Sequence, residues 1–195
     1  LNSDGRFKKV LFDNDMIKSN RSFAITKLKN NIKIIDSFIS NEEKNLIILT
    51  SIGRIFKFNL SDKFLTPTTK QSQGSILVKL LPSEMIVSCC CTFQDTANIY
   101  LVSKRGKIFC LNTSEIYFAN EYSLGYLNEI SQLKNDSFLK VLPSSHFLDI
   151  ETNKNKSARL NLDKLNFKSN KTNFLFNFLN LETNEHLENC FHLKS

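Results

Sequence analysis

The stretch Leu46-Ile47-Ile48-Leu49-Thr50-Ser51-Ile52-Gly53-Arg54-Ile55-Phe56-Lys57 contains two short apolar runs on either side of a single glycine. The run from Leu46 to Ser51 shows no polar alternation, so we expect a strand that is buried on both faces. Gly53 supplies the positive φ that a tight hairpin turn requires, and the second strand then runs from Arg54 to Leu60. The stretch therefore predicts a tight antiparallel hairpin whose sheet is packed between two others.

The same turn occurs three times along the chain. Its glycines, Gly5, Gly53 and Gly106, are 48 and 53 residues apart, and each is followed by Arg or Lys and then by an apolar residue. A period of this size is typical of arrays of small all-β units, such as propellers. We therefore interpret the chain as a series of repeats, with these three glycines as its structural turns.

Two further strands recur in register with the turns. One of them lies upstream of each hairpin, at Ile32 to Phe38, Glu84 to Cys89 and Asp136 to Val141. The other precedes it, at Ser22 to Ile25, Gly74 to Leu77 and Gly125 to Leu127. Four strands in a unit of about 50 residues match the size of a propeller blade. The Gly-His to Trp-Asp and Gly-Gly signatures of common propellers are missing from the sequence, which has no Trp.

A fourth hairpin is expected near residue 155, although it lacks a glycine. Its strands would run from Phe147 to Ile150 and from Ser157 to Leu162, with Asn153 to Lys156 as the turn. Asn tolerates the left-handed backbone conformation better than other non-glycine residues, so a turn can still form. The repeats then span residues 1–165, as units near 1–20, 21–70, 71–120 and 121–165. We expect residues 166–195, rich in Asn, Phe and Leu, to form a degenerate strand pair, a cap or a tail.

Composition narrows the class of protein. The chain has 195 residues, 41% of them apolar, with 17 Phe, which is enough to build a buried core. No apolar run approaches the roughly 20 residues that span a bilayer, and the first residues are too polar for a secretory signal, so we expect a soluble chain without a membrane partner. Because it begins with Leu1 and its first turn follows almost at once, we expect a fragment.

The cysteines and the net charge add two further expectations. Cys89-Cys90-Cys91 lie in an apolar run, where strand geometry sends the middle thiol to the opposite face, so buried thiols are favoured over a metal site. Five cysteines without a disulfide or metal pattern suit a reducing compartment. A net charge of +7 favours polyanionic partners.

The stretch Leu46 to Lys57 resembles the repeat of the C-terminal domain of bacterial DNA gyrase A and of its topoisomerase IV relative, in which Thr-Ser-x-Gly-Arg is the characteristic turn. The segment from Pro67 to Pro82, with Gly74 before an Ile-containing strand and the pair Leu80-Leu81, is also similar to that family. The resemblance covers about residues 1–165 and is strongest from Leu46 to Gly125.

This resemblance implies an all-β fold, a β-pinwheel, which is a propeller-like disc of four-stranded blades that exchange strands with their neighbours. Three complete units and a degenerate fourth would make a partial or reduced disc of three to four repeats. The resemblance also implies that a basic outer rim binds duplex DNA and bends it. The Gln-Arg-Arg-Gly-Gly-Lys-Gly box that defines gyrases is absent, and the nearest basic stretch, Thr69 to Gly74, has one lysine, so strong chiral wrapping is not implied.

Basic residues recur at equivalent places in the repeats, as a rim that contacts phosphates would require. We expect DNA contacts without base readout, because no recognition helix is visible and a curved surface can wrap DNA through phosphate contacts and DNA bendability. The candidate rim residues are Arg6, Lys8, Lys9, Arg54, Lys57, Lys70, Lys104, Arg105, Lys107, Lys154, Lys156 and Arg159.

No catalytic constellation is visible in the sequence. The three histidines, His146, His186 and His192, lack the spacing of a metal site or a triad. None of the four tyrosines has the helical, Arg-flanked context of a DNA-cleaving nucleophile; they are Tyr100, Tyr117, Tyr122 and Tyr126. We expect a chain without catalysis, cofactor or metal of its own.

Three hypotheses about function remain. The first is the DNA-bending, non-catalytic region of the A subunit of a type IIA topoisomerase, whose partners are a cleavage core upstream and the ATPase B subunit of the same enzyme. ATP and Mg²⁺ would then bind only in the complete enzyme, in a bacterial cytoplasm or a plastid. The second is a propeller-type scaffold that binds proteins, and the third is a decaying paralogue without a DNA function.

Overall fold

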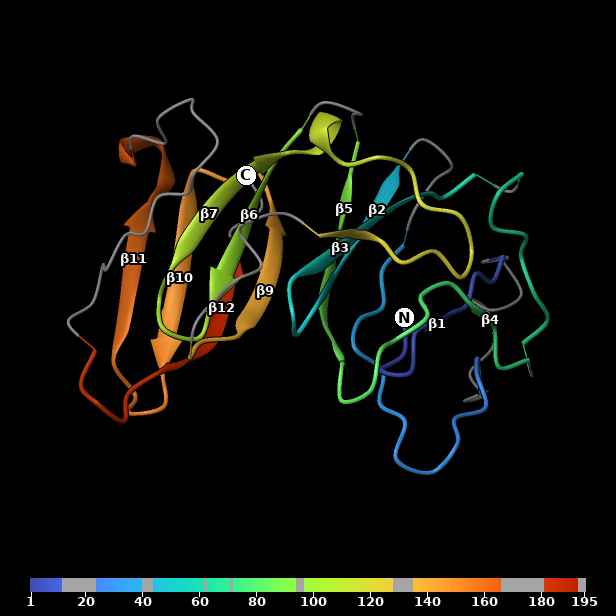
Figure 1. Ribbon diagram of the computed structural model, residues 1–195, viewed down its shortest axis with the longest axis horizontal. Coiled ribbons are helices and arrows are strands. Elements are labelled where there is room, and N and C mark those ends of the chain that lie inside the picture. Colours follow the sequence, from blue (N-terminus) through green and yellow to red (C-terminus); the bar gives the residue numbers. More distant parts are fainter. Residues whose placement is uncertain are drawn as a thin grey trace, which may run out of the picture.

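The computed structural model describes residues 1–11, 24–39, 44–61, 63–70, 72–93, 97–127, 135–165 and 181–192. Within these residues the chain is almost entirely β, as expected, and its strands form four small antiparallel sheets (Figure 1). We call these sheets blades 1 to 4. Blade 1 contains β1 (Arg6–Phe7) and β4 (Ser75–Ile76); blade 2 contains β5 (Ile86–Thr92), β2 (Asn45–Thr50), β3 (Arg54–Asn59) and β8 (Tyr126–Leu127); blade 3 contains β9 (Phe138–Pro143), β6 (Asn98–Ser103) and β7 (Ile108–Asn112); and blade 4 contains β12 (Leu187–His192), β10 (Phe147–Thr152) and β11 (Ser157–Asn161).

The three glycine turns form as expected, and Asn155 makes the fourth. Gly5, Gly53 and Gly106 have φ angles of 83°, 87° and 79°, and Asn155 has a φ of 59°. The N–H of Asn155 donates to the carbonyl of Thr152 at 2.9 Å, and the N–H of Gly53 bonds the residue three before it in the same way, at 3.0 Å. The prediction of a hairpin turn without glycine is therefore confirmed, because Asn adopts the left-handed conformation that the other turns reach with glycine.

A second repeated device follows the outer strand of blades 3 and 4. A single turn of 3-10 helix comes after β7 at Thr113–Glu115 and after β11 at Leu162–Lys164. Both turns are capped by an asparagine, Asn112 or Asn161, whose side-chain oxygen accepts the backbone N–H two residues on. The degenerate fourth unit therefore keeps this local structure as well as its turn.

In blades 2, 3 and 4 the third strand follows the hairpin that it joins. β5 pairs with β2, β9 with β6 and β12 with β10, so the expected placement upstream of each hairpin is wrong. In all four turns, a backbone N–H donates to a carbonyl of the segment that leads to the position of the third strand. These bonds run from Ser3 to Lys33, from Ser51 to Met85, from Lys104 to Ser137 and from Asn153 to His186, at 2.8, 2.8, 2.8 and 3.0 Å.

The fourth strand of blade 2 is supplied from much later in the chain. β8 pairs with β3, where Arg54 lies opposite Leu127, and β4 pairs with β1 in the same way. The glycine before β8 permits this close approach, since a Cβ on Gly125 would lie 2.6 Å from the Phe56 ring. The expectation that neighbouring blades exchange strands is confirmed by these two pairings.

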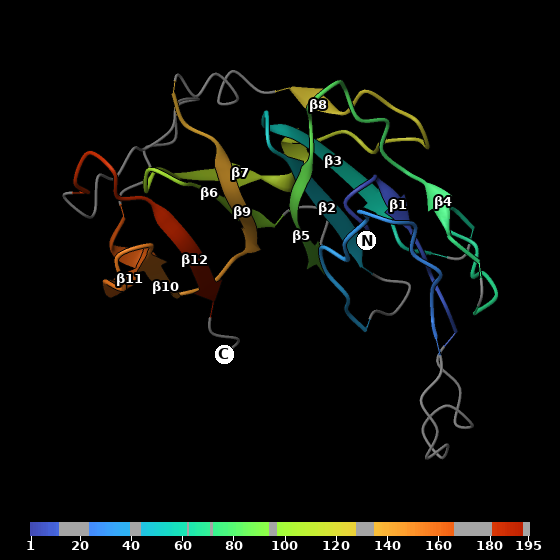
Figure 2. The ribbon, with the colours of Figure 1, turned by 90° about the horizontal axis from the view of Figure 1, so that it is seen from below.

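The core lies between the blades, in three apolar clusters. β2 is buried along its whole length, with Leu46 and Ile48 packed toward blade 1 and Ile47 and Leu49 packed toward blade 3. This confirms the expectation that both faces of the strand are buried. The strands β5, β9 and β12 run next to one another from blade 2 to blade 4 (Figure 2).

The cysteines of β5 follow the same alternation. Cys89 packs in the cluster between blades 1 and 2, and Cys90 in the cluster between blades 2 and 3. Burial raises the pKa of both thiols, and no disulfide forms among the five cysteines. The middle thiol therefore points to the opposite face, as the sequence predicts.

Some expected elements differ or lie outside the described residues. Ile32 to Phe38 form no strand, because only Ile34 makes a bridge, to Asn2. Residues 22 and 23 of the expected strand at Ser22 to Ile25 are outside the described part, as are residues 166–180 and 193–195 of the C-terminal segment. Within that segment, β12 is the third strand of blade 4.

Candidate nucleic-acid interface

Arg54, the cation that follows the second turn, is buried inside blade 2. Its guanidinium donates to both carboxylate oxygens of Glu84, with 2.8 Å between Nε and Oε1, and the side chains are almost fully enclosed. It also donates to the carbonyls of Leu124 and Lys79, each at 2.8 Å. Arg54 therefore joins the turn, the approach to β5 and the segment that leads into β8.

Glu84 keeps its charge in this buried place. Burial tends to raise the pKa of its carboxyl group, but the hydrogen bond from Arg54 opposes this, together with those from the Leu81 N–H and the Thr50 hydroxyl. The balance holds the pKa of Glu84 below its ordinary value. Both side chains are therefore charged at neutral pH, and they form an ion pair in the interior of the protein.

Lys57 is buried as well, and its ammonium points away from solvent. Nζ donates to the carbonyl of Thr113 at 3.1 Å and lies 4.4 Å from the centre of the Phe118 ring. Because Arg54 and Lys57 are each about 2% exposed, the prediction that they lie on an exposed rim is wrong. Their positive charges are neutralised or solvated by the protein itself.

The cations of blade 1 are half-buried and also bind backbone carbonyls. Arg6 donates to the carbonyl of Gly74 at 3.1 Å and pairs with Asp4. Lys9 donates to the carbonyl of Leu60 at 2.6 Å. These bonds attach β1 to the segments around it, so these residues help to build the blade.

Lys8 performs the same role with three acceptors. Its Nζ donates to the carbonyls of Ile25, Lys70 and Ser72, and desolvation lowers its pKa. Lys70 itself has an exposed side chain. Blade 1 therefore uses lysine mainly to hold loops together.

The cations of blade 4 are exposed and paired. Lys156 binds Glu185 at 2.9 Å, Lys154 binds Glu182, and Arg159 binds Asp149 through two hydrogen bonds of 2.6 and 2.8 Å. The hydrogen bond from Lys156 is the main reason that the pKa of the Glu185 carboxyl is lowered. The three cations have side-chain exposures of 40% (Lys154), 51% (Lys156) and 59% (Arg159), so they remain accessible to a large anion.

Blade 3 differs from its neighbours because its turn cations have no acidic partner among the described residues. Lys104 and Arg105 are exposed and Lys107 is half-buried, and none of the three side chains forms an ion pair with any residue of the described part of the chain. The acid at the place of Glu84 is the shorter Asp136. Its Oδ1 accepts the N–H groups of Arg105 and Ser137, and its Oδ2 is buried without a partner.

The turns of blades 3 and 4 lie close together. Lys104 and Arg105 line a shallow hollow with His186, and the N–H of Leu187 donates to the carbonyl of Lys104 at 2.7 Å. In Figure 1 both turns lie at the lower ends of their sheets. We call this region the basic turn surface; its residues are Lys104, Arg105, Lys107, Lys154, Lys156 and Arg159.

Six of the twelve predicted rim cations thus lie in the turns or edge strands of blades 3 and 4. Arg6, Lys8, Lys9, Arg54 and Lys57 instead bind groups of the interior and the loops, and Lys70 lies in the loop that leads to β4. Sequence reasoning missed the acids that decide this division. Glu84 and Glu185 stand two residues before the third strands, and this repeated position was the available signal.

No group of three or more His, Cys, Asp or Glu in the described ranges could hold a metal ion. His146 forms an exposed pair with Asp163 at 2.7 Å, while the side chain of His192 is outside the described part. Burial raises the pKa of Tyr100 to about 12. Among the described residues, no helix is long and apolar enough to cross a membrane.

Comparison with known proteins gives structural matches. No protein-family model and no curated protein matches the sequence. One similar solved structure is the C-terminal domain of a DNA topoisomerase IV, with a TM-score of 0.84 and 16% identity, and the match covers 100% of this chain and 60% of that one. A DNA gyrase A C-terminal domain has a TM-score of 0.65 and 23% identity, covering 85% of this chain and 54% of that one.

The C-terminal domain of E. coli ParC has a TM-score of 0.61 and 11% identity, covering 85% of this chain and 69% of that one. The chain therefore spans between about half and about two thirds of the length of these structures. With four antiparallel blades, two exchanged strands and these neighbours, the chain has the β-pinwheel fold of the topoisomerase IV and DNA gyrase A C-terminal domains.

Proposed function

We propose that this chain binds and bends duplex DNA as the C-terminal region of the A subunit of a type IIA topoisomerase. The observation that carries the proposal is the fold, which matches a topoisomerase IV C-terminal domain over the whole chain. The basic turn surface supports it, because exposed Lys and Arg side chains on two neighbouring blades suit the closely spaced phosphates of a duplex. In this role the chain controls DNA supercoiling without chemistry of its own.

The complete enzyme would supply the remaining parts. The partners that we propose are a DNA-cleaving core and the ATPase B subunit, where ATP and Mg²⁺ would bind. A bacterial cytoplasm, close to the nucleoid, or a plastid is the compartment that this role requires.

Binding to a duplex of about 100 base pairs, measured by fluorescence anisotropy at several salt concentrations, tests this proposal. We expect affinity that changes little with sequence and falls steeply with salt, since phosphate contacts release counterions. The double variant Lys104→Ala/Arg105→Ala should bind more weakly and with a smaller salt slope. Lys27→Ala/Lys29→Ala removes two exposed lysines outside the basic turn surface and is the matched control for net charge.

Two results would contradict the proposal. One is a wild-type chain that folds but does not retain DNA at low salt, which is the behaviour expected of a decaying paralogue. The other is an equal loss of affinity in both double variants, which would mean that net charge alone attracts DNA.

The protein-binding scaffold is the second candidate, and one observation favours it. At the turn of blade 2, Ile52 and Met85 are exposed by 42% and 60%, and Leu81 lies nearby in sequence with 44% exposure. The blade 2 turn is thus apolar where the blade 3 and blade 4 turns are basic. Pull-down of a protein partner that Ile52→Ser/Met85→Ser abolishes, with duplex binding absent, would favour this candidate.

A further inference from the structure

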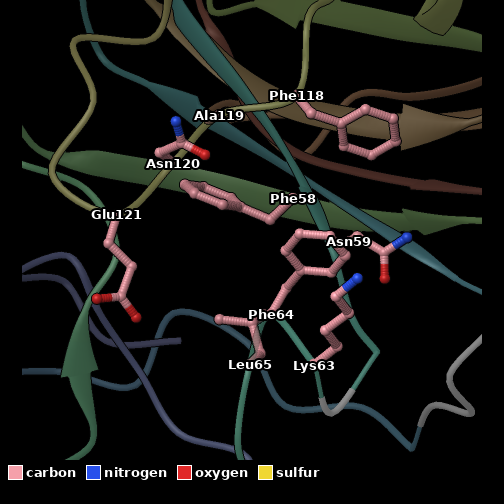
Figure 3. A pocket seen from close by; sticks show the side chains of 9 residues that line it. All are labelled: Phe58, Asn59, Lys63, Phe64, Leu65, Phe118, Ala119, Asn120 and Glu121. Carbon is pink, nitrogen blue, oxygen red and sulfur yellow. The ribbon is translucent and has the colours of Figure 1, made fainter.

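A cleft lined by aromatic rings lies at the end of β3 in blade 2 (Figure 3). Its volume is about 360 Å³. The floor is Phe58, which is buried and stacked on Phe56 with 6.2 Å between the ring centres. Further lining residues come from the loop after β3 and from the segment that leads toward β8; they are Asn59, Lys63, Phe64, Leu65, Phe118, Ala119, Asn120 and Glu121.

Phe64 is held at the mouth of this cleft by the turn that contains it. The side chain of Asn59 accepts the N–H of Ser61, and the carbonyl of Ser61 accepts the N–H groups of Phe64 and Leu65 at 3.1 and 2.9 Å. Leu65 enters the core, whereas Phe64 remains 61% exposed. Local hydrogen bonds therefore present a large apolar ring to solvent in a fixed place.

Phe118 is placed by Lys57 from the opposite side of the cleft. The two residues form a parallel bridge, with the N–H of Ala119 donating to the carbonyl of Lys57 at 2.7 Å, and the Lys57 ammonium lies against the ring. Phe118 is 49% exposed. The cleft is thus built from both the blade and the segment that crosses it.

Polar side chains that could form hydrogen bonds with the edge of a planar ligand lie around the Phe58 ring. In Figure 3 the amide of Asn120 lies beside that ring, and Glu121 and Lys63 occupy opposite ends of the cleft. The amide offers hydrogen-bond donors and an acceptor, and a carboxylate accepts a hydrogen bond from the exocyclic amino group of a base. Lys63 adds a positive charge at the mouth, on a chain that carries +7 overall.

We propose that this cleft binds one base of a single-stranded nucleic acid. The base stacks on the exposed Phe64 ring above the floor formed by Phe58, its polar edge faces Asn120 and Glu121, and the adjacent phosphate lies toward Lys63. Aromatic rings beside basic residues are the usual means of holding unpaired bases. This role goes beyond duplex bending, since a base inside a duplex is stacked on its neighbours and cannot enter the cleft.

The test compares two 12-residue strands of equal charge. One is fluorescein-labelled oligo(dC), whose bases carry an exocyclic amino group, and the other has the same phosphodiester backbone with abasic sugars. We expect the whole chain to bind oligo(dC) about tenfold more tightly than the abasic strand, since stacking on an aromatic side chain contributes that much per base. Phe64→Ala should remove most of this difference and leave abasic-strand binding unchanged.

Phe93→Ala is the matched control, because Phe93 is 69% exposed and lies under the Lys44 ammonium, much as Phe64 lies near Lys63, yet it is outside the cleft. It should leave the preference for bases intact. Equal affinity of the wild type for both strands, or equal effects of the two variants, would overturn the inference, and either result is what a cleft for a protein side chain would give. Duplex binding by the Phe64→Ala variant, measured in parallel, keeps this outcome separate from the bending proposal.

Discussion

The Arg54 guanidinium donates to both carboxylate oxygens of Glu84, which lies 30 residues further along the chain. Because both side chains are enclosed, this ion pair closes the turn of blade 2 onto the approach to its third strand. Lys156 and Glu185 occupy the equivalent places in blade 4 and form the same pair, with Lys156 exposed and Glu185 buried. The pair thus recurs in blades 2 and 4, whereas Arg6 of blade 1 pairs with Asp4 and blade 3 has the shorter Asp136 at the position of the acid.

Breaking the buried pair should be costly. We expect Glu84→Gln to lower the free energy of unfolding by about 3–5 kcal/mol, since it leaves the Arg54 charge buried without its partner. Urea denaturation followed by circular dichroism measures this. Asp149→Asn is the control at an exposed pair, where the loss should be much smaller because solvent screens the charges. A similar loss in the two variants would show that burial does not strengthen the pair.

The same pair should make the protein sensitive to acid. The pKa of Glu84 is lowered in the folded state, so its contribution to stability is fully present above the ordinary value of 4.5 and is lost as pH falls through the lower folded value. The urea midpoint of the wild type should therefore fall more between pH 5 and about pH 3 than that of Glu84→Gln. Parallel curves for the two proteins would refute this assignment.

Blade 3 can be tested by lengthening its acid. Asp136→Glu adds one methylene and keeps the charge, so the carboxylate should reach Lys107 as Glu185 reaches Lys156. Satisfying the buried oxygen that now lacks a partner should stabilise the fold by about 1 kcal/mol. The unfolding midpoint measures the gain, and Asp149→Glu, at an acid that already has its partner, should give none.

The backbone conformation of the turns gives a further prediction. Gly53 has a φ of 87°, so Gly53→Ala should destabilise the protein by roughly 1–2 kcal/mol, the cost of the left-handed conformation for an ordinary residue. Asn155→Gly should be neutral or slightly stabilising, because its φ of 59° is one that glycine adopts freely. Thermal unfolding compares the two, and a clear loss of stability in Asn155→Gly would mean that the Asn155 side chain has a role of its own.

Local patterns were enough to predict much of the fold. The glycine turns, the burial of β2 on both faces and the opposite directions of Cys89 and Cys90 follow from turn conformation and from the two-residue period of a strand. The assignment of each third strand to a hairpin did not follow, because β5 begins 27 residues after the end of β3 and ends 6 residues before the start of β6, so distance in sequence favours the wrong hairpin. Only the pairing of β5 with β2 decides which hairpin it joins.

The candidate interface could be predicted only in part, because the sequence does not show which distant residues pair. A basic residue after each turn was visible in the sequence, but Arg54 and Lys107 look alike there and differ in the structure. Arg54 pairs with a glutamate that is long enough to reach it, while the equivalent acid in blade 3 is Asp136, whose Oδ1 already accepts two backbone N–H groups.

By itself, then, the sequence determined the repeat, its turns and the alternation of its buried side chains, all of which depend on neighbouring residues. The tertiary structure alone decided which sheet each later strand completes and which cations remain at the surface. Both depend on partners that are 30 or more residues away, such as Glu84 for Arg54 and β8 for β3. Their distance in space is set by the packing of the blades.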